Sequence, residues 1–302
     1  MTRKLRTPLV FLAVFAALLL LHLTVLELPY YWDEAGYFVP AARDIYTDGS
    51  FVPHSTLSNA HPPLVMAWLA LAWKLFGFHV WVARAAMLAV AALALTGLFA
   101  LSERVANARV AAAAVLCTAL YPVFFAQSSL AHLDMMVAAL TLWALVFYLP
   151  HAGREGDAAG ASERSSARRA ACVVLLALAA LAKETAVLVP AVLCGWELLC
   201  RLSGKKEKLA SLVCLERRPA WHSLALLLAG VPLALWFAYH RARTGYTLGN
   251  PEYFRYNVES TLNLARVLDT VWRRLGHVTF HMNLWALTLA GLAAMLLKPR
   301  RD

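Results

Sequence analysis

Long runs of uncharged, mostly hydrophobic residues follow one another along this chain, separated by short polar segments. Each run is at least 18 residues long, which is enough for a helix to cross the roughly 30 Å hydrocarbon core of a bilayer. The pattern therefore predicts an all-α protein that spans a membrane several times. The uncharged runs are residues 7–26, 85–102, 110–133, 135–153, 219–240 and 275–297.

Two further apolar segments are short or interrupted. The run 64–73 is too short to cross, which favours a helix at about 62–78 that lies in the membrane interface. Residues 170–200 carry Lys183 and Glu184 at their centre. As one helix, this segment would be about 46 Å long and would leave a charged pair near the bilayer centre. A two-helix hairpin that turns near these charges avoids both problems.

These segments give about eight transmembrane helices, with both chain ends in the cytoplasm and one membrane domain over 1–302. Most of the 28 Lys and Arg residues then lie on the cytoplasmic side, as the positive-inside rule requires. Residues 29–79 and about 241–276 become outer loops. The Gly-, Ala- and Ser-rich segment 151–169 reads as a cytoplasmic linker.

Composition excludes the other broad classes. With 61% hydrophobic and only 15% charged residues, and a mean hydropathy of +0.60, the chain has more apolar residues than a soluble core could hide. The net charge of +10 does not point to nucleic acid, because basic residues sit between apolar runs and suit topology and anionic headgroups. The five cysteines form neither a disulfide framework nor a spaced metal set. The Ala- and Leu-rich usage suits a bacterial inner membrane.

In this topology the ionisable residues gather at one membrane boundary. Asp33 and Glu34 follow the first span, Asp134 lies at the next outer turn, and Lys183 and Glu184 lie at the hairpin turn. Such groups at the rim of a helical bundle often line a substrate cavity. Other readings stay open from the residues alone: solvated loop charge or a helix N-cap for the aspartates, and a structural ion pair at the hairpin.

Carboxylates beside a membrane and among aromatic residues are partly desolvated, which raises their pKa toward the range of a general base. Because neighbouring helical residues face different ways, we expect only one of Asp33 and Glu34 to act. On spacing alone, His61 before Pro62 and Pro63 is more simply a capping or hydrogen-bonding residue.

The order of these motifs resembles the polyprenyl-phosphate-sugar-dependent membrane glycosyltransferases of GT-C fold, a group that includes protein O-mannosyltransferases and lipid A aminoarabinose transferases. The resemblance covers about residues 8–200 in collinear order. It rests on Asp33-Glu34 after the first span, His61-Pro62-Pro63-Leu64 before a Trp-rich helix, Arg84 at the start of the second span, Ala131 to Met135, and Leu181 to Thr185.

The resemblance implies an inverting transfer of a sugar from a polyprenyl-phosphate donor to a lipid, glycan or protein acceptor at the outer face. The implied catalytic residues are Asp33 as general base, Glu34 as its alternative, and Asp134, which would orient the acceptor, position Lys183 or hold Mg²⁺ or Mn²⁺. The sequence requires no metal. The implied donor-phosphate ligands are His61, Arg84 and Lys183, and the further substrate-contact candidates are Tyr37, Glu184 and Tyr253.

Two other functions compete with this reading. A transporter or flippase of a lipid-linked sugar would need polar groups through the bilayer, and the segments between Arg84 and Glu103 and between Arg109 and Asp134 contain no charge. A non-catalytic subunit that retains the fold is the other alternative.

Overall fold

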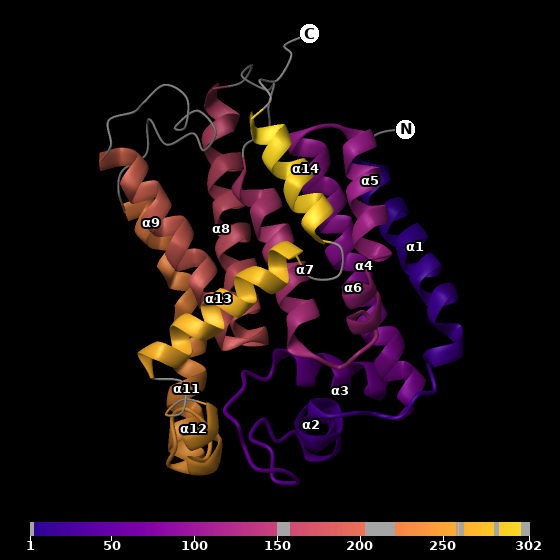
Figure 1. Ribbon diagram of the computed structural model, residues 1–302. Coiled ribbons are helices and arrows are strands. Elements are labelled where there is room, and N and C mark those ends of the chain that lie inside the picture. The colour runs from indigo at the N-terminus through magenta and orange to yellow at the C-terminus, as the bar shows by residue number, and fades with distance from the viewer. Residues whose placement is uncertain are drawn as a thin grey trace. The chain divides into compact units, whose positions relative to one another are not determined.

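The computed structural model describes residues 3–149, 158–202, 221–257, 259, 263–280 and 284–296. Every regular element in this part of the chain is a helix, which confirms the predicted all-helical fold (Figure 1). By packing, the chain divides into two compact units, Met1–Thr247 and Leu248–Asp302. The single domain over 1–302 stays a prediction. The first unit contains all of the predicted site residues except Tyr253.

The helices of the first unit follow the apolar runs closely. The first unit contains α1 Arg3–His22, α2 Val39–Asp48, α3 Leu64–Phe76, α4 Val80–Val105, α5 Ala108–Ala119, α6 Pro122–Gln127, α7 Leu133–Tyr148, α8 Ala158–Ala182, α9 Leu188–Leu202, α10 Trp221–Leu224 and α11 Val231–Thr244. Short turns join them: η1 Leu23–Val25, η2 Glu34–Phe38, η3 Glu184–Val187 and η5 Ala225–Gly230. The second unit contains α12 Pro251–Asn257, α13 Leu264–Phe280 and α14 Leu284–Leu296.

The membrane-spanning character is clear, whereas the number of spans stays a prediction. In the described residues, four helical stretches are long and apolar enough to cross: Arg6–Val25, Val80–Val105, Glu184–Leu202 and Ala225–Thr244. Shorter apolar helices are α3, α5 and α7. The interfacial position of α3 also stays a prediction, although a helix forms where the sequence places it.

Local chemistry explains where the helices break. The predicted hairpin is present, because α8 ends at Ala182 and α9 begins at Leu188 after the turn η3. The apolar run 110–133 forms two helices rather than one. Pro122 has no backbone N–H, so it begins a new helix, α6, instead of continuing α5.

The predicted cytoplasmic linker 151–169 differs in part from the structure. Residues 150–157 lie outside the described residues, and from Ala158 onward the predicted linker 151–169 belongs to α8. Its Ala, Glu and Arg residues favour a helix, which outweighs the Gly and Ser content on which the linker prediction rests. Residues 281–283, inside the predicted span 275–297, are also outside the described residues.

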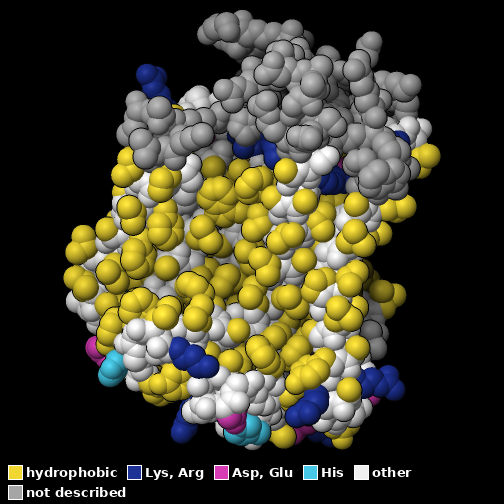
Figure 2. Space-filling model, turned by 180° about the vertical axis from the view of Figure 1, so that it is seen from behind, with side chains coloured by type: hydrophobic (Ala, Val, Ile, Leu, Met, Phe, Trp, Pro, Cys, Tyr) yellow, Lys and Arg dark blue, Asp and Glu magenta, His cyan; other side chains and the backbone are white. Residues whose placement is uncertain are grey.

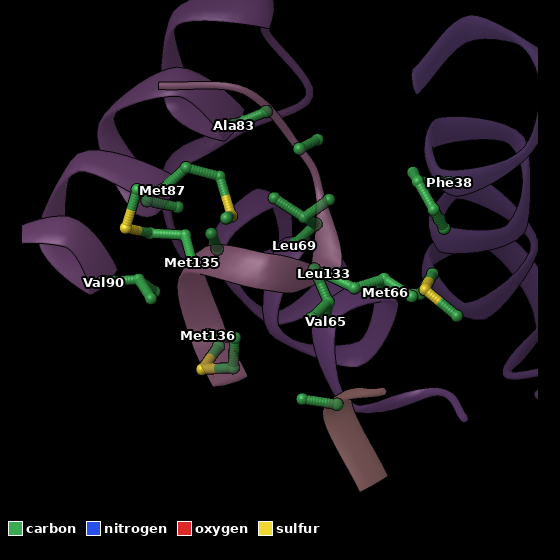
Figure 3. Close-up of a cluster of buried hydrophobic side chains, with 14 of the residues drawn as sticks. Phe38, Val65, Met66, Leu69, Ala83, Met87, Val90, Leu133, Met135 and Met136 are labelled. Carbon is green, nitrogen blue, oxygen red and sulfur yellow. The ribbon is translucent and has the colours of Figure 1, made fainter. Parts of the chain in front are cut away.

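A buried cluster of hydrophobic side chains joins α3, α4 and α7. Figure 3 shows Leu69 of α3, Met87 of α4 and Met135 of α7 pointing toward one another. Methionine fills irregular gaps well because its side chain is unbranched and flexible. The cluster packs α3 against α4, which carries Arg84, and α7, which carries Asp134.

The helices α4 and α7 pack closely at one glycine. A Cβ added to Gly97 would lie 3.1 Å from the Cδ1 atom of Trp143. The indole of Trp143 is itself held, since its Nε1 donates to the carbonyl oxygen of Leu93 at 3.0 Å. Only a residue without a side chain allows this approach.

The surface matches a lipid environment. Figure 2 shows hydrophobic side chains over most of one face, with several charged and histidine side chains gathered toward its lower edge. Large apolar side chains such as Leu12, Leu20 and Leu21 of α1 are exposed. A soluble protein rarely exposes so much contiguous apolar surface, and the chain is an integral membrane protein.

Candidate active site

Four segments that are distant in sequence meet at one end of the first unit: η2, the loop before α3, the start of α7 and the turn after α8. The backbone N–H of Ala131 donates to Glu34 Oε1 at 2.6 Å. Lys183 Nζ lies 2.7 Å from Asp134 Oδ1. In Figure 1 this end carries α2 and α3, and the N-terminus lies at the opposite end.

Asp33 sits at the start of η2 with its side chain exposed. The preceding Trp32 has a φ of 49°, a left-handed conformation that is unusual for a bulky residue. The turn itself is π-helical, a geometry found often at functional sites. Asp33 occupies the N-cap position, but its side chain makes no capping hydrogen bond. The N-cap alternative therefore does not explain this carboxylate.

Glu34 faces the opposite way and is fully buried. Its Oε1 lies 2.5 Å from Arg84 Nη1, and its Oε2 lies 3.1 Å from Arg84 Nη2. Arg84 is also buried and donates to the carbonyl oxygens of Ser129 at 3.1 Å and Pro29 at 3.0 Å. This bidentate pair ties α4 to the turn that presents Asp33. A contact between Arg84 and the donor phosphate stays a prediction.

The aromatic ring of Tyr30 packs against Arg84 in the ion pair of Glu34 and Arg84. The guanidinium carbon of Arg84 lies 5.2 Å from the ring centroid, in a cation–π arrangement. Burial raises the pKa of the Tyr30 phenol to about 12, although the charge of Arg84 opposes the rise. The phenol therefore stays neutral at any physiological pH.

Asp134 and Lys183 form a pair that is open to solvent. The Asp134 side chain is 71% exposed and that of Lys183 is 29% exposed. Asp134 lies in the first turn of α7, where a negative charge is favoured by the helix dipole. Exposed pairs of this kind contribute only about 0–1 kcal/mol. Lys183 can therefore exchange Asp134 for another anion at little cost.

His61 lies against the turn after α8 and among aromatic rings. Its Nδ1 is 3.2 Å from Glu184 Oε2. The ring centroids of Tyr37 and Phe38 are 5.6 Å and 5.8 Å from that of His61. Phe38 also contacts His132, two residues before Asp134, with centroids 5.9 Å apart. The predicted residues His61, Tyr37 and Glu184 are thus neighbours.

Sequence reasoning missed the residues that hold the loop before His61. These are Ser58 in the loop and Trp236 and His240 on α11. Ser58 and Trp236 form hydrogen bonds with the backbone of Ala60, and His240 forms one with Ser58. The available signal was His240 itself, the last residue of the charge-free run 219–240. No spacing in the sequence links His240 to His61, so the sequence alone does not predict these hydrogen bonds.

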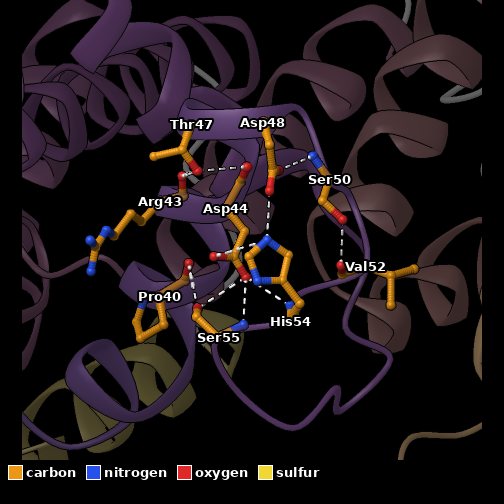
Figure 4. Close-up of polar contacts among 9 residues, drawn as sticks. All are labelled: Pro40, Arg43, Asp44, Thr47, Asp48, Ser50, Val52, His54 and Ser55. Carbon is orange, nitrogen blue, oxygen red and sulfur yellow. Dashed lines mark hydrogen bonds and ion pairs between the residues drawn. The ribbon is translucent and has the colours of Figure 1, made fainter.

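A second polar cluster, also missed, folds the start of the same loop (Figure 4). Asp44 is buried, and its Oδ2 accepts hydrogen bonds from the backbone N–H groups of His54 at 2.8 Å and Ser55 at 2.9 Å. His54 Nε2 lies 2.6 Å from Asp48 Oδ2. The hydrogen bond from Asp48 raises the pKa of His54, and the hydrogen bond from His54 lowers the pKa of Asp48.

Tyr253 belongs to the second unit, on α12, where its backbone N–H donates to Asn250 Oδ1 at 2.9 Å. Its contact with substrate stays a prediction. Among the residues that the structure describes, no three His, Cys, Asp or Glu side chains gather in a way that could hold a metal ion. Asp134 therefore has one observed cationic partner, Lys183, and no observed ligand set around it.

Two solved structures resemble this fold. Both are of ArnT from Cupriavidus metallidurans, and both share 21% sequence identity with this chain. The form bound to undecaprenyl phosphate matches with a TM-score of 0.60 over 84% of this chain, and the apo form with 0.59 over 85%. The chain spans 44% and 45% of the length of those two chains. Among curated proteins, none matches the sequence.

A family model described as dolichyl-phosphate-mannose-protein mannosyltransferase matches residues 60–236, which is more than half of the chain. The matched segment begins at the anchored Ala60, includes Arg84, Asp134 and Lys183, and ends at Trp236. The resemblance drawn from the ordered motifs is thereby confirmed, and this chain belongs to the dolichyl-phosphate-mannose-protein mannosyltransferase family of membrane glycosyltransferases.

Proposed function

We propose that this protein transfers a sugar from a polyprenyl-phosphate donor to an acceptor at the outer face of the membrane, with inversion at the anomeric carbon. The observation that carries the proposal is that the exposed carboxylate of Asp33 lies at the same end of the first unit as Lys183 and His61. ArnT binds undecaprenyl phosphate in the structure that resembles this chain, which supports a donor of the same lipid class.

In the proposed reaction, Asp33 takes a proton from the acceptor hydroxyl or amine as that atom attacks the anomeric carbon. The bond between the anomeric carbon and the phosphate oxygen breaks, and its electron pair leaves with the polyprenyl phosphate. A single displacement of this kind inverts the anomeric centre. The proton ends on Asp33, and the products are the glycosylated acceptor and the lipid phosphate.

The phosphate is already a weak base, so the leaving group needs positive charge rather than a strong acid. Lys183 is suited to supply that charge, and His61 is suited to add a ring nitrogen as a hydrogen-bonding group. Both lie at the same end as Asp33, and each is held by a carboxylate, Asp134 and Glu184 respectively. Glu34 is not suited to act as the base, because both of its oxygens are bonded to buried Arg84.

The decisive experiment is a transfer assay in proteoliposomes with defined polyprenyl-phosphate sugars and the variant Asp33→Asn. We expect the rate to fall about a hundredfold or more, the scale of a lost general base. The matched control is Asp269→Asn, the same change at an exposed residue of α13 that pairs with Arg273.

Wild-type activity in Asp33→Asn would overturn the assignment of the base. A wild-type protein that moves the lipid-linked sugar across the bilayer without transferring it would instead support a flippase. A protein that does neither alone but activates a second chain would be a non-catalytic subunit.

A further inference from the structure

The residue before His61 has a backbone conformation that must be held in place. Ala60 has a φ of 60° and is almost completely buried. Residues with a side chain seldom adopt this left-handed region, and doing so costs about 1–3 kcal/mol unless surrounding contacts compensate. The loop would relax to another conformation if nothing opposed it, so the contacts of Ala60 are informative.

Both backbone polar groups of Ala60 are engaged. Its carbonyl oxygen accepts a hydrogen bond from the indole Nε1 of Trp236 at 2.9 Å, a contact that joins residues 176 positions apart. Its N–H donates to Ser58 Oγ at 3.3 Å. Ser58 Oγ in turn lies 2.7 Å from His240 Nε2. Two residues of α11 therefore hold Ala60, Trp236 directly and His240 through Ser58.

The direction of the hydrogen bonds in this network follows from its chemistry. His240 Nδ1 lies 2.8 Å from the carbonyl oxygen of Tyr246, which can only accept, so Nδ1 carries the proton. In the neutral imidazole, Nε2 is then an acceptor for the Ser58 hydroxyl, whose oxygen still accepts from the N–H of Ala60. Trp236 and His240 are buried one helical turn apart, with ring centroids separated by 6.0 Å.

The next residues transmit this anchoring to His61. Pro62 restricts the backbone of the residue before it to extended conformations, so His61 has little freedom of its own. The ring is fixed on its far side by Glu184, 3.2 Å away. The position of the imidazole is consequently set by α11 through Ala60 and by the turn after α8 through Glu184.

We propose that Ser58, Trp236 and His240 are positioning residues that hold His61 where it contacts the donor phosphate. This inference rests on the proposed function for the role of His61 itself. The three residues act through Ala60 rather than by touching substrate. A rigid loop of this kind places a binding group before the substrate arrives, and small displacements of such groups lower affinity and rate steeply.

The test measures the affinity of the full chain in nanodiscs for undecaprenyl phosphate, so that it does not depend on transfer. Trp236→Phe removes the indole N–H and keeps an aromatic ring. We expect affinity to fall on the order of tenfold. Trp143→Phe is the matched control, because it removes an indole-to-carbonyl bond of 3.0 Å between α7 and α4, away from the loop, and we expect affinity to change less than about twofold.

A double-mutant cycle separates positioning from a general loss of structure. In a His61→Ala background, Trp236→Phe should have almost no further effect on affinity, because the group that it positions is gone. Ser58→Ala should weaken binding in the same way, and Ser58→Thr, which keeps the hydroxyl, should restore it. The serine variants lie in a loop and keep the test valid if Trp236→Phe folds poorly.

Three results would overturn the proposal: equal effects of Trp236→Phe with and without His61, equal effects of Trp236→Phe and Trp143→Phe, or binding of undecaprenyl phosphate that does not depend on His61. Failure of the proposed function looks different. In that case Asp33→Asn keeps full transfer activity, or wild type transfers no sugar, whatever the coupling between Trp236 and His61.

Discussion

At the scale of single residues, the clearest feature is the separation of two adjacent carboxylates into opposite environments. Asp33 is exposed at the start of η2, whereas Glu34 is fully buried against Arg84. The sequence predicted that only one of the two acts, because neighbouring residues on a helical turn diverge. The tertiary structure joins Glu34 to an arginine 50 residues away and leaves Asp33 exposed, and the role of Asp33 as the base stays a prediction.

The buried pair and the exposed pair should differ sharply in their contribution to stability. Glu34→Gln leaves the charge of Arg84 buried without its partner, and we expect the free energy of unfolding to fall by about 3–5 kcal/mol. Asp134→Asn disrupts the solvent-exposed pair with Lys183 and should lower it by less than about 1 kcal/mol. Denaturant unfolding in mixed micelles measures both, and similar small losses in the two variants would contradict the structural role of Arg84.

The stability of the loop cluster around His54 should depend on pH. The folded-state pKa of His54 lies above its ordinary value of 6.5, so its contribution is fully present below that value and is lost as the pH rises through the folded pKa. The folded-state pKa of Asp48 lies below its ordinary value of 3.8, so its contribution is present above that value and is lost as the pH falls through the folded pKa.

The measurement is amide hydrogen exchange of residues 50–55, corrected for intrinsic exchange, at about pH 6 and about pH 8.5, either side of a histidine pKa. We expect greater protection at the lower pH. His54→Gln should remove the difference between the two conditions, and an unchanged difference in that variant would assign the effect to another group.

At the scale of elements, the apolar runs determined most helices, and local chemistry set their ends. Pro122 begins α6, and the charged pair Lys183 and Glu184 lies in the break between α8 and α9. Periodicity does not show how closely two helices pack. That property depends on single small residues such as Gly97 at the contact between α4 and α7.

Substituting this glycine should destabilise the protein even though alanine is the better helix former. In Gly97→Ala the new Cβ would lie 3.1 Å from Trp143 Cδ1, and overpacking of this kind costs about 1–3 kcal/mol. Gly195→Ala on α9 is the control, since nothing lies within 4 Å of its Cβ position. Thermal unfolding in detergent should show a lower melting temperature for the first variant only. Equal melting temperatures would mean that α4 and α7 separate easily.

At the scale of the whole molecule, the proposed function requires four residues to lie on the same side of the membrane: Asp33, His61, Asp134 and Lys183. The contacts between η2, the loop before α3, α7 and the turn after α8 place these residues at the same end of the first unit. The predicted topology assigns that end to the outer face.

Cysteine labelling tests this orientation. In a protein with its five native cysteines replaced, Ser50→Cys should react with an impermeant thiol reagent added to intact cells, since it lies in the predicted outer loop. Ser203→Cys, which lies outside the described residues, should react only after permeabilisation, because the hairpin returns the chain to the cytoplasm. Labelling of Ser203→Cys from outside would show that the assigned topology is wrong.

By itself the sequence determined that this is a helical membrane protein of a lipid-dependent glycosyltransferase family, because long apolar runs and an ordered motif set are local properties. Only the tertiary structure decided that Glu34 is bound to Arg84 and that Trp236 and His240 anchor the loop of His61. These contacts join residues 50 to 182 positions apart. The periodicity of hydrophobic residues predicts local elements and gives no information on contacts between residues so far apart in sequence. The sequence could not predict the left-handed backbone conformation of Ala60 either, because that conformation is imposed by the hydrogen-bond partners of Ala60 rather than by its own side chain.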